Sequence, residues 1–165
     1  MVLVEDECRV QRESSIKSIW YRKGTYPTIK VDQKKEGRSF YGALDVKTGK
    51  DHVWDCERQN SAATVCFLRQ LEDYYQGKQV LLLWDGAPSH RGKVKAYLRE
   101  RKRWQLTLVY FPPYSPDLNP QEHVWKQAKQ ATTHNSEDSF DNKLYKFRQY
   151  LVHITFTTNF LEKYT

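Results

Sequence analysis

Long apolar runs, paired cysteines and glycine-rich phosphate loops are all missing from this sequence of 165 residues. No apolar run approaches the ~20 residues that a membrane-spanning helix needs, and the chain does not begin with the basic and apolar regions of a signal peptide. Cys8, Cys56 and Cys66 are widely spaced and form no CxxC pair, which indicates reduced thiols in an intracellular protein. The five histidines are not spaced as zinc ligands, and no Ser-His-Asp arrangement is present, so a zinc site and a serine hydrolase are not indicated.

The composition is that of a globular protein of one domain. Apolar residues make up 39% of the chain and aromatic residues 14%, which is sufficient for a buried core at this length. No repeat, low-complexity tract or linker divides the sequence. We therefore expect residues 1–165 to form a single domain.

Positive charge is concentrated in one segment of the chain. The formal net charge is +7, and seven basic residues and one acid lie between Arg91 and Arg103, so this segment holds nearly all of the excess. Clustered lysine and arginine neutralise phosphates and favour a nucleic-acid partner, although a solvated helix face would have the same composition. The residues that we predict to bind a nucleic acid are Arg91, Lys93, Lys95, Arg99, Arg101, Lys102 and Arg103.

Hydrophobic patterning predicts three strands followed by alternating helices and strands. Strands are predicted over 1–10, in two runs of 39–56 joined by a turn at Thr48 and Gly49, and over 79–85 and 106–111; helices are predicted over 62–75, 92–104 and 119–130. Apolar positions at steps of four and three predict a long C-terminal helix through Phe140, Leu144, Phe147, Leu151, Ile154, Thr158 and Leu161. This order of elements indicates an α/β domain with a mixed central sheet of about five strands flanked by helices.

Three carboxylates occupy positions where chemistry is expected. Asp6 lies on the apolar side of the first strand, where an unpaired charge is costly, whereas Glu5 and Glu7 lie on the other side and are expected to be solvated. Asp85 ends a continuous apolar strand, and open α/β sheets bind ligands beyond the carboxyl ends of their strands. Glu122 lies in the first turn of a predicted helix.

Each carboxylate also has a structural explanation. Asp6 could be a hydrogen-bonded core residue, and Asp85 could be a turn or cap residue. Glu122 could complete a capping box, because Asn119 is a good N-cap three residues earlier. Three converging carboxylates without a cysteine or histidine pattern would instead suit Mg²⁺ or Mn²⁺, and two such ions roughly 3.5–4 Å apart promote in-line attack at phosphorus.

Three stretches of the chain resemble the signature blocks of DDE transposases, most closely the insertion-sequence branch of the mariner superfamily. They are VEDECRV, LLLWDGAPSHRGK and VYFPPYSPDLNPQEHVWKQAK, and they follow the family's order across nearly the whole chain. The resemblance implies a ribonuclease-H-like fold, and it implies that Asp6, Asp85 and Glu122 are the metal-binding catalytic acids. His90 and Asn119 are placed beside the site as auxiliary residues, although His90 could equally be a simple helix N-terminal residue.

The chemistry that this resemblance implies is metal-dependent cutting of DNA at transposon ends, followed by joining of the freed 3′-hydroxyl to target DNA. It further implies two Mg²⁺ or Mn²⁺ ions, a homodimer assembled on DNA, no membrane or small-molecule partner, and a place in the cytoplasm or nucleoid of a prokaryote. The alternative is an inactive or partial transposase that only binds DNA or a protein. A nuclease for RNA–DNA hybrids would have no reason to carry the third block.

The sequence departs from the family pattern in two respects. Gly86 follows Asp85 where the family more often has asparagine. Relatives usually carry an N-terminal helix-turn-helix region, whereas this chain begins at the first catalytic strand. We therefore expect no sequence-specific recognition of transposon ends by this chain alone.

Overall fold

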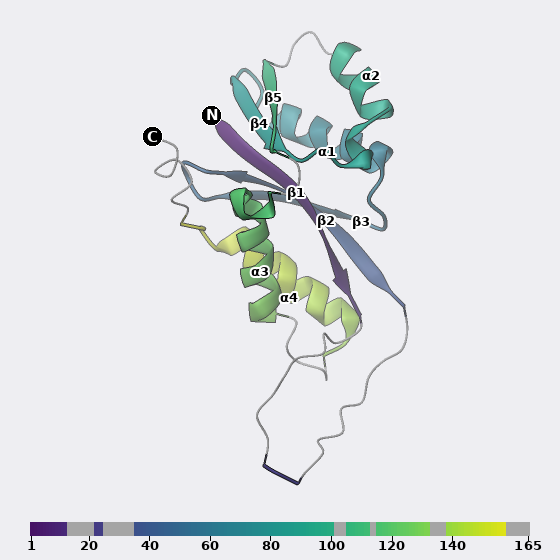
Figure 1. Cartoon of the computed structure of the whole chain (residues 1–165), viewed down its shortest axis with the longest axis vertical. Coiled ribbons are helices and arrows are strands. Elements are labelled where there is room, and N and C mark those ends of the chain that lie inside the picture. The colour runs from purple at the N-terminus through teal and green to yellow at the C-terminus, as the bar shows by residue number, and fades with distance from the viewer. Residues whose placement is uncertain (13–21, 25–34, 101–104, 113–114, 133–137, 158–165) are drawn as a thin grey trace.

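A five-stranded mixed sheet forms the centre of the molecule (Figure 1). The computed structural model describes residues 1–12, 22–24, 35–100, 105–112, 115–132 and 138–157. The strand order is β3-β2-β1-β4-β5, with bounds β1 Val2–Gln11, β2 Gly37–Asp45, β3 Asp51–Cys56, β4 Val80–Trp84 and β5 Leu106–Tyr110. The predicted α/β class and mixed sheet are therefore confirmed.

The directions of the strands set where their ends meet. β2 pairs antiparallel with both β1 and β3, whereas β4 pairs parallel with both β1 and β5. β1 is the central strand, and it continues past the end of β4 because Val4 is already level with Leu83. The carboxyl ends of β4 and β5 therefore lie level with the middle of β1.

The predicted turn between the second and third strands is present. Gly49 has a φ of +71°, a conformation that side chains with a Cβ rarely adopt. The Asp45 carboxylate closes the turn by accepting hydrogen bonds from the Lys47 amide at 3.0 Å and from the Thr48 hydroxyl at 2.9 Å. This local chemistry fixes the register of β2 against β3.

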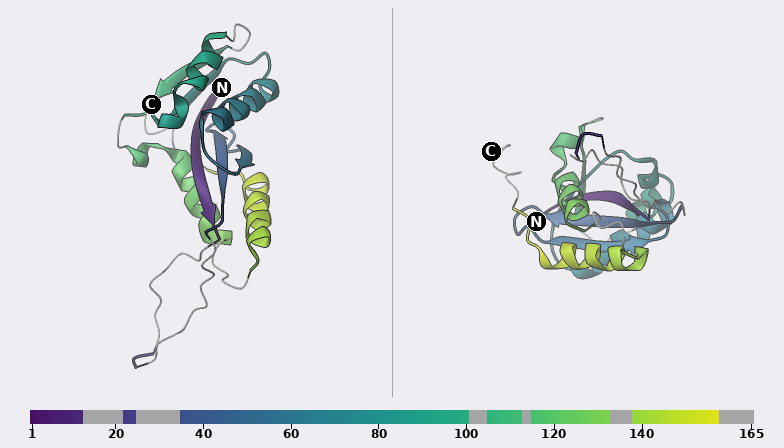
Figure 2. Two further views of the ribbon diagram at one scale, coloured as in Figure 1. Left: turned by 90° about the vertical axis from the view of Figure 1, so that its right-hand side faces the viewer. Right: turned by 90° about the horizontal axis from the view of Figure 1, so that it is seen from below.

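Helices cover both faces of the sheet (Figure 2). The α-helices are α1 Ser61–Tyr74, α2 Lys93–Glu100, α3 Pro120–Thr132 and α4 Phe140–His153, and short 3₁₀ turns η1 and η2 span Pro88–His90 and Pro116–Leu118. One core joins α1 and α2 to alternate strand residues such as Leu3 and Tyr41. The other joins α3 and α4, which lie side by side, to intervening residues such as Phe40 and Leu44. Alternation along the strands thus places successive side chains in different cores.

The C-terminal helix is shorter than the sequence predicts. α4 ends at His153, and Ile154 has extended backbone angles, φ −96° and ψ 138°. The amide of Phe156 donates a hydrogen bond to the Gly49 carbonyl at 2.7 Å, and its ring is buried. The β-branched stretch after His153 therefore continues as extended chain against the β2–β3 turn, and Thr158 and Leu161 lie outside the described residues.

The other predicted helices are found where the structure describes them. α2 covers the first part of the predicted helix at 92–104, whose last four residues lie outside the described ranges. Among the described residues, no helix has both the length and the apolar character to cross a lipid bilayer.

Candidate active site

The three carboxylates singled out by the sequence line one cavity. Asp6, Asp85 and Glu122 contribute to a cavity of about 790 Å³ whose other walls come from residues 86–88, Arg91, Tyr110–Pro112, Ser115 and Asn119. The cavity lies where β4 and β5 end and α3 begins. Its position agrees with the rule that open α/β sheets bind ligands at the carboxyl ends of their strands.

Strand register brings the first two acids together. Val4 pairs with Leu83, so extending the parallel register by two residues places Asp6 of β1 beside Asp85, which directly follows β4. Residues level with one another in parallel strands face the same side of the sheet. The two carboxylates therefore lie on the same face of the sheet, which α3 covers, and both line the cavity.

The third acid is positioned by the close approach of α3 to the sheet. Asn119 caps the helix, because its side-chain oxygen accepts a hydrogen bond from the Gln121 amide at 3.0 Å. A Cβ on Gly42 of β2 would lie 2.6 Å from the Trp125 ring and would clash with the side chain of Gln121. Glycine at position 42 thus lets α3 pack tightly enough for Glu122 to reach the cavity.

Two polar contacts hold α3 in this place. The Trp125 indole donates a hydrogen bond to Asp6 at 3.2 Å, and the Gln121 amide donates one to Asp51 at 2.8 Å. Trp125 is three residues after Glu122, so the two side chains lie on neighbouring positions of the helix. Trp125 is a supporting residue that the sequence analysis did not identify, and its spacing of three residues from Glu122 is the signal that could have found it.

Negative charge accumulates at Asp6. Burial and the nearby charge of Glu122 raise the pKa of Asp6 from 3.8 to about 8, and the charges of Glu7 and Asp85 add to this effect. A divalent cation would offset that repulsion, and carboxylate oxygens are the ligands that Mg²⁺ and Mn²⁺ prefer. The donor set of the cavity therefore fits such ions.

His90 contacts both the backbone carbonyl and the carboxylate of Asp85. Its Nδ1 lies 2.9 Å from the Asp85 carbonyl oxygen and 3.2 Å from the carboxylate, and its ring stacks on Trp84 with a centroid separation of 4.2 Å. The Ala87 amide also donates to the Asp85 carboxylate at 2.8 Å. The hydrogen bond with His90 is the main reason that the pKa of Asp85 is lowered, so this acid is ionised when Asp6 is not.

The expectation that Glu5 and Glu7 are solvated is wrong. Glu5 is 1% exposed and Glu7 is half-buried, because α1, η1 and α2 cover this face of β1 as well. His90 Nε2 lies 3.4 Å from Glu7 and 3.5 Å from Glu5. Burial alone would lower the pKa of His90, but its contacts with Asp85, Glu7 and Glu5 raise it to about 11.

The predicted DNA-binding residues are only partly described. Arg91 is exposed and lines the cavity, and Lys93, Lys95 and Arg99 are exposed on α2, which begins two residues later. Arg101, Lys102 and Arg103 lie outside the described residues. Positive charge therefore begins at the cavity wall and continues along one helix.

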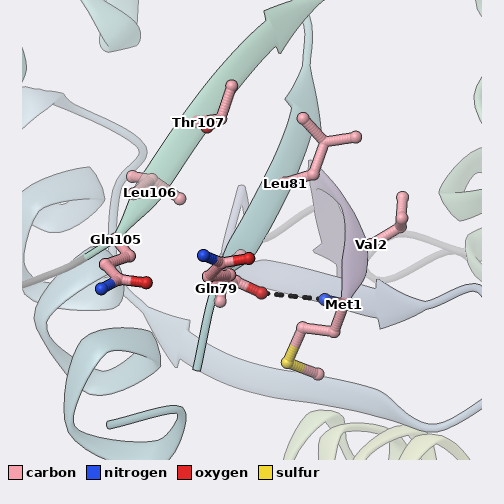
Figure 3. Close-up of a pocket in the computed structure, with 8 residues that line it drawn as sticks. Met1, Val2, Gln79, Leu81, Gln105, Leu106 and Thr107 are labelled. Carbon is pink, nitrogen blue, oxygen red and sulfur yellow. Dashed lines mark hydrogen bonds between the residues drawn. The ribbon is translucent and has the colours of Figure 1, made fainter. Parts of the chain in front are cut away.

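A second cavity, of about 570 Å³, lies at the opposite ends of the parallel strands (Figure 3). It is lined by Met1, Val2, 79–81 and 105–107, and the Met1 amino group donates to the Gln79 carbonyl at 2.8 Å. The residues that line it include no carboxylate side chain. Of these two cavities, the one at the carboxyl ends of β4 and β5 is therefore the one with carboxylate ligands for a cation.

Comparisons with known proteins identify a family model and a relative that match this chain. A family model described as DDE superfamily endonuclease matches residues 1–143. The chain is 26% identical over 140 residues to the insertion element IS630 uncharacterized 39 kDa protein of Shigella sonnei, a match that covers 84% of this chain but only 40% of that relative.

Solved structures share the fold at low sequence identity. The Mos1 transposase paired-end complex with the left transposon end has a TM-score of 0.72 at 17% identity, covering 97% of this chain and 50% of that one. The catalytic core domain of BIV integrase has a TM-score of 0.54 at 12% identity, covering 92% and 80%. The predicted ribonuclease-H-like fold is therefore confirmed.

Proposed function

The chain belongs to the DDE superfamily endonucleases, and we propose that it is the metal-dependent catalytic domain of a transposase that cuts DNA at transposon ends and joins the freed 3′-hydroxyl to target DNA. The single observation that carries this proposal is the meeting of Asp6, Asp85 and Glu122 in one cavity. These acids come from three separate blocks of the sequence, and only the fold brings them together.

Asp6, Asp85 and Glu122 would hold the divalent cations, which when bound supply an activated water or hydroxyl nucleophile and neutralise charge on the leaving oxygen. Two ions are proposed rather than one. The ligand atoms of Asp6, Asp85 and Glu122 do not all lie within 4.8 Å of one another. Among the described residues, the group that meets this limit is a different one. Their wider spacing supports division of the carboxylates between two ions.

The residues around the acids set the charge and the orientation of two of them. His90 and Ala87 keep Asp85 ionised and fixed, and Trp125 orients Asp6 through its indole N–H. Glu122 is exposed on the first turn of α3, where it can adjust as a scissile phosphate enters. The site therefore combines two oriented carboxylates with one that is freer to move.

DNA is the proposed partner, and α2 is the proposed path along which it approaches. Arg91 at the cavity wall would contact the phosphate nearest the scissile bond, and Lys93, Lys95 and Arg99 would contact phosphates farther along. Assembly as a homodimer on DNA is part of the proposal. The solved relatives include Mos1 complexes with paired ends and with Mn or Mg. Because the Shigella sonnei relative belongs to a bacterial insertion element, we place this chain in a bacterial cell.

The test is nicking of supercoiled DNA in the presence of Mn²⁺. Asp85→Asn and Glu122→Gln should each abolish nicking, because each removes a charged ligand without changing the size of the side chain. Asp141→Asn and Glu57→Gln change exposed acids away from the cavity and serve as matched controls that should nick normally. Nicking that survives either cavity substitution would contradict the proposal.

Calorimetry separates this enzyme from the alternative of a domain that only binds DNA or a protein. The wild-type chain should bind Mn²⁺, and Asp85→Asn should weaken that binding. A chain that neither binds Mn²⁺ nor nicks DNA would be the inactive form of the domain.

A further inference from the structure

A second group of ligand-type side chains lies on the opposite face of β1 from Asp6. Glu5, Glu7 and His90 each offer one ligand atom, and these three atoms all lie within 4.8 Å of one another. The group is close to the core between the sheet and α1, where Trp84 covers the His90 ring. It shares no side chain with the trio formed by Asp6, Asp85 and Glu122.

Three polar atoms of this group are buried without a hydrogen bond. Among the described residues, both carboxylate oxygens of Glu5 and the Nε2 of His90 have no hydrogen-bond partner, while the two residues are 1% and 3% exposed. A buried carboxylate without a hydrogen bond is costly, and such groups in proteins are normally paired with a cation or bound to a metal. The Nε2 of His90 lies within 3.5 Å of both carboxylates, and a metal ion that took the place of the Nε2 proton could bind all three side chains.

We propose that Glu5, Glu7 and His90 form a metal site that binds Zn²⁺. The Nε2–Oε distances of 3.4 and 3.5 Å are longer than ordinary hydrogen bonds. They match the edge of a tetrahedron whose metal–ligand bonds are about 2.0–2.1 Å, which is about 3.4 Å. The spacing therefore suits ligands around a common ion better than direct contact.

The surroundings also prepare the ligands. Nδ1 of His90 donates to the Asp85 carbonyl at 2.9 Å, so Nε2 is the ring nitrogen that faces the carboxylates and would bind the ion once it has lost its proton, as in most metal-bound histidines. The Ser89 hydroxyl donates to Glu7 at 3.2 Å and orients that carboxylate. Any proton on Nε2 would be displaced by the cation and released to solvent.

The two sites should select different ions. The cavity trio offers only carboxylate oxygens, which suit Mg²⁺ and Mn²⁺, whereas an imidazole nitrogen with two carboxylates favours Zn²⁺ over Mg²⁺. A bound Zn²⁺ would fix the His90 ring and, through it, the backbone of Asp85. The ion would therefore be a structural support of the cavity rather than a participant in the cutting of DNA.

The test is Zn²⁺ titration of the full chain in excess Mg²⁺, followed by calorimetry and, with Co²⁺ as probe, by visible absorption. One equivalent should bind, with the spectrum of a tetrahedral nitrogen and oxygen site. Glu7→Gln and His90→Gln should each weaken binding by at least the ~100-fold that loss of a mere outer partner can cost. Glu100→Gln and His153→Asn, both exposed, should leave binding unchanged.

A second background keeps this result independent of DNA cutting. The triple variant Asp6→Asn, Asp85→Asn, Glu122→Gln should still bind one Zn²⁺ and should be stabilised by it, whereas adding Glu7→Gln should remove that thermal shift. Absence of Zn²⁺ binding, binding that persists in both Glu7→Gln and His90→Gln, or a Co²⁺–thiolate absorption band would each overturn the proposal.

Discussion

Replacement of Gly42 by alanine should loosen the active site through helix packing alone. The added Cβ would lie 2.6 Å from the Trp125 ring and would meet the Gln121 side chain, so α3 must move away from β2. Overpacking of this kind typically costs about 1–3 kcal/mol. For a chain of this length, each kcal/mol lowers the melting temperature by about 2–4 °C, which gives an expected fall of about 2–12 °C.

The nicking rate of the Gly42→Ala variant should also fall, and by more than its modest loss of folded stability would suggest. Glu122 lies three residues before Trp125 on α3, so a helix shift near 1 Å would misplace this carboxylate and could cost ~100-fold in nicking rate. The assays are thermal unfolding and plasmid nicking at a temperature where the variant is folded. Gly86→Ala is the stability control, since a Cβ there has nothing within 4 Å. A Gly42→Ala protein with unchanged melting temperature and full nicking would refute the reasoning.

Three other changes have defined outcomes. Asp6→Asn should stabilise the metal-free protein by about 4 kcal/mol at pH 7. The folded pKa of Asp6, about 8, lies above its ordinary value of 3.8, so the stability of the wild-type protein falls as the pH rises between these two values. The gain should vanish below pH 4 in melting experiments. Lys95→Ala with Arg99→Ala should weaken DNA binding at all sequences and reduce the slope of log affinity against log salt by about 2, and an unchanged slope would remove α2 from the DNA path. Asp55→Asn should lower the free energy of unfolding, because Arg38 and Arg148 both donate to this carboxylate at 2.6–2.8 Å. In denaturant unfolding, this loss of stability should be the same with and without Mg²⁺.

Much of the fold could be predicted because local patterns and tertiary packing agree. The alternation in β1, the turn at Gly49 and the Asn119 cap each have local causes that a sequence displays. The end of the C-terminal helix could not be found in this way. Its apolar spacing continues past His153, but the chain leaves the helix where the Phe156 amide pairs with the Gly49 carbonyl and the Phe156 ring is buried.

The places of the three candidate acids on their elements could be predicted from the sequence, but the residues that surround them could not. Asp85 and Glu122 stand at element boundaries that the sequence marks, whereas the burial of Glu5 depends on which helices cover the second face of β1. The contact between His90 and the two glutamates joins residues more than eighty positions apart. No spacing rule for metal ligands reaches across such an interval, so only the folded chain shows it.

Successive side chains of the ten-residue strand β1 point to opposite faces, so the site depends on whether a residue is an odd or an even number of positions along it. Asp6 faces the cavity, and its immediate neighbours Glu5 and Glu7 face the other core. A single-residue insertion or deletion ahead of Asp6 would leave an acidic, strand-forming segment but would turn a glutamate toward the cavity and bury the aspartate behind it. Length changes in this strand should therefore be tolerated only in steps of two, a constraint that substitutions alone would not reveal.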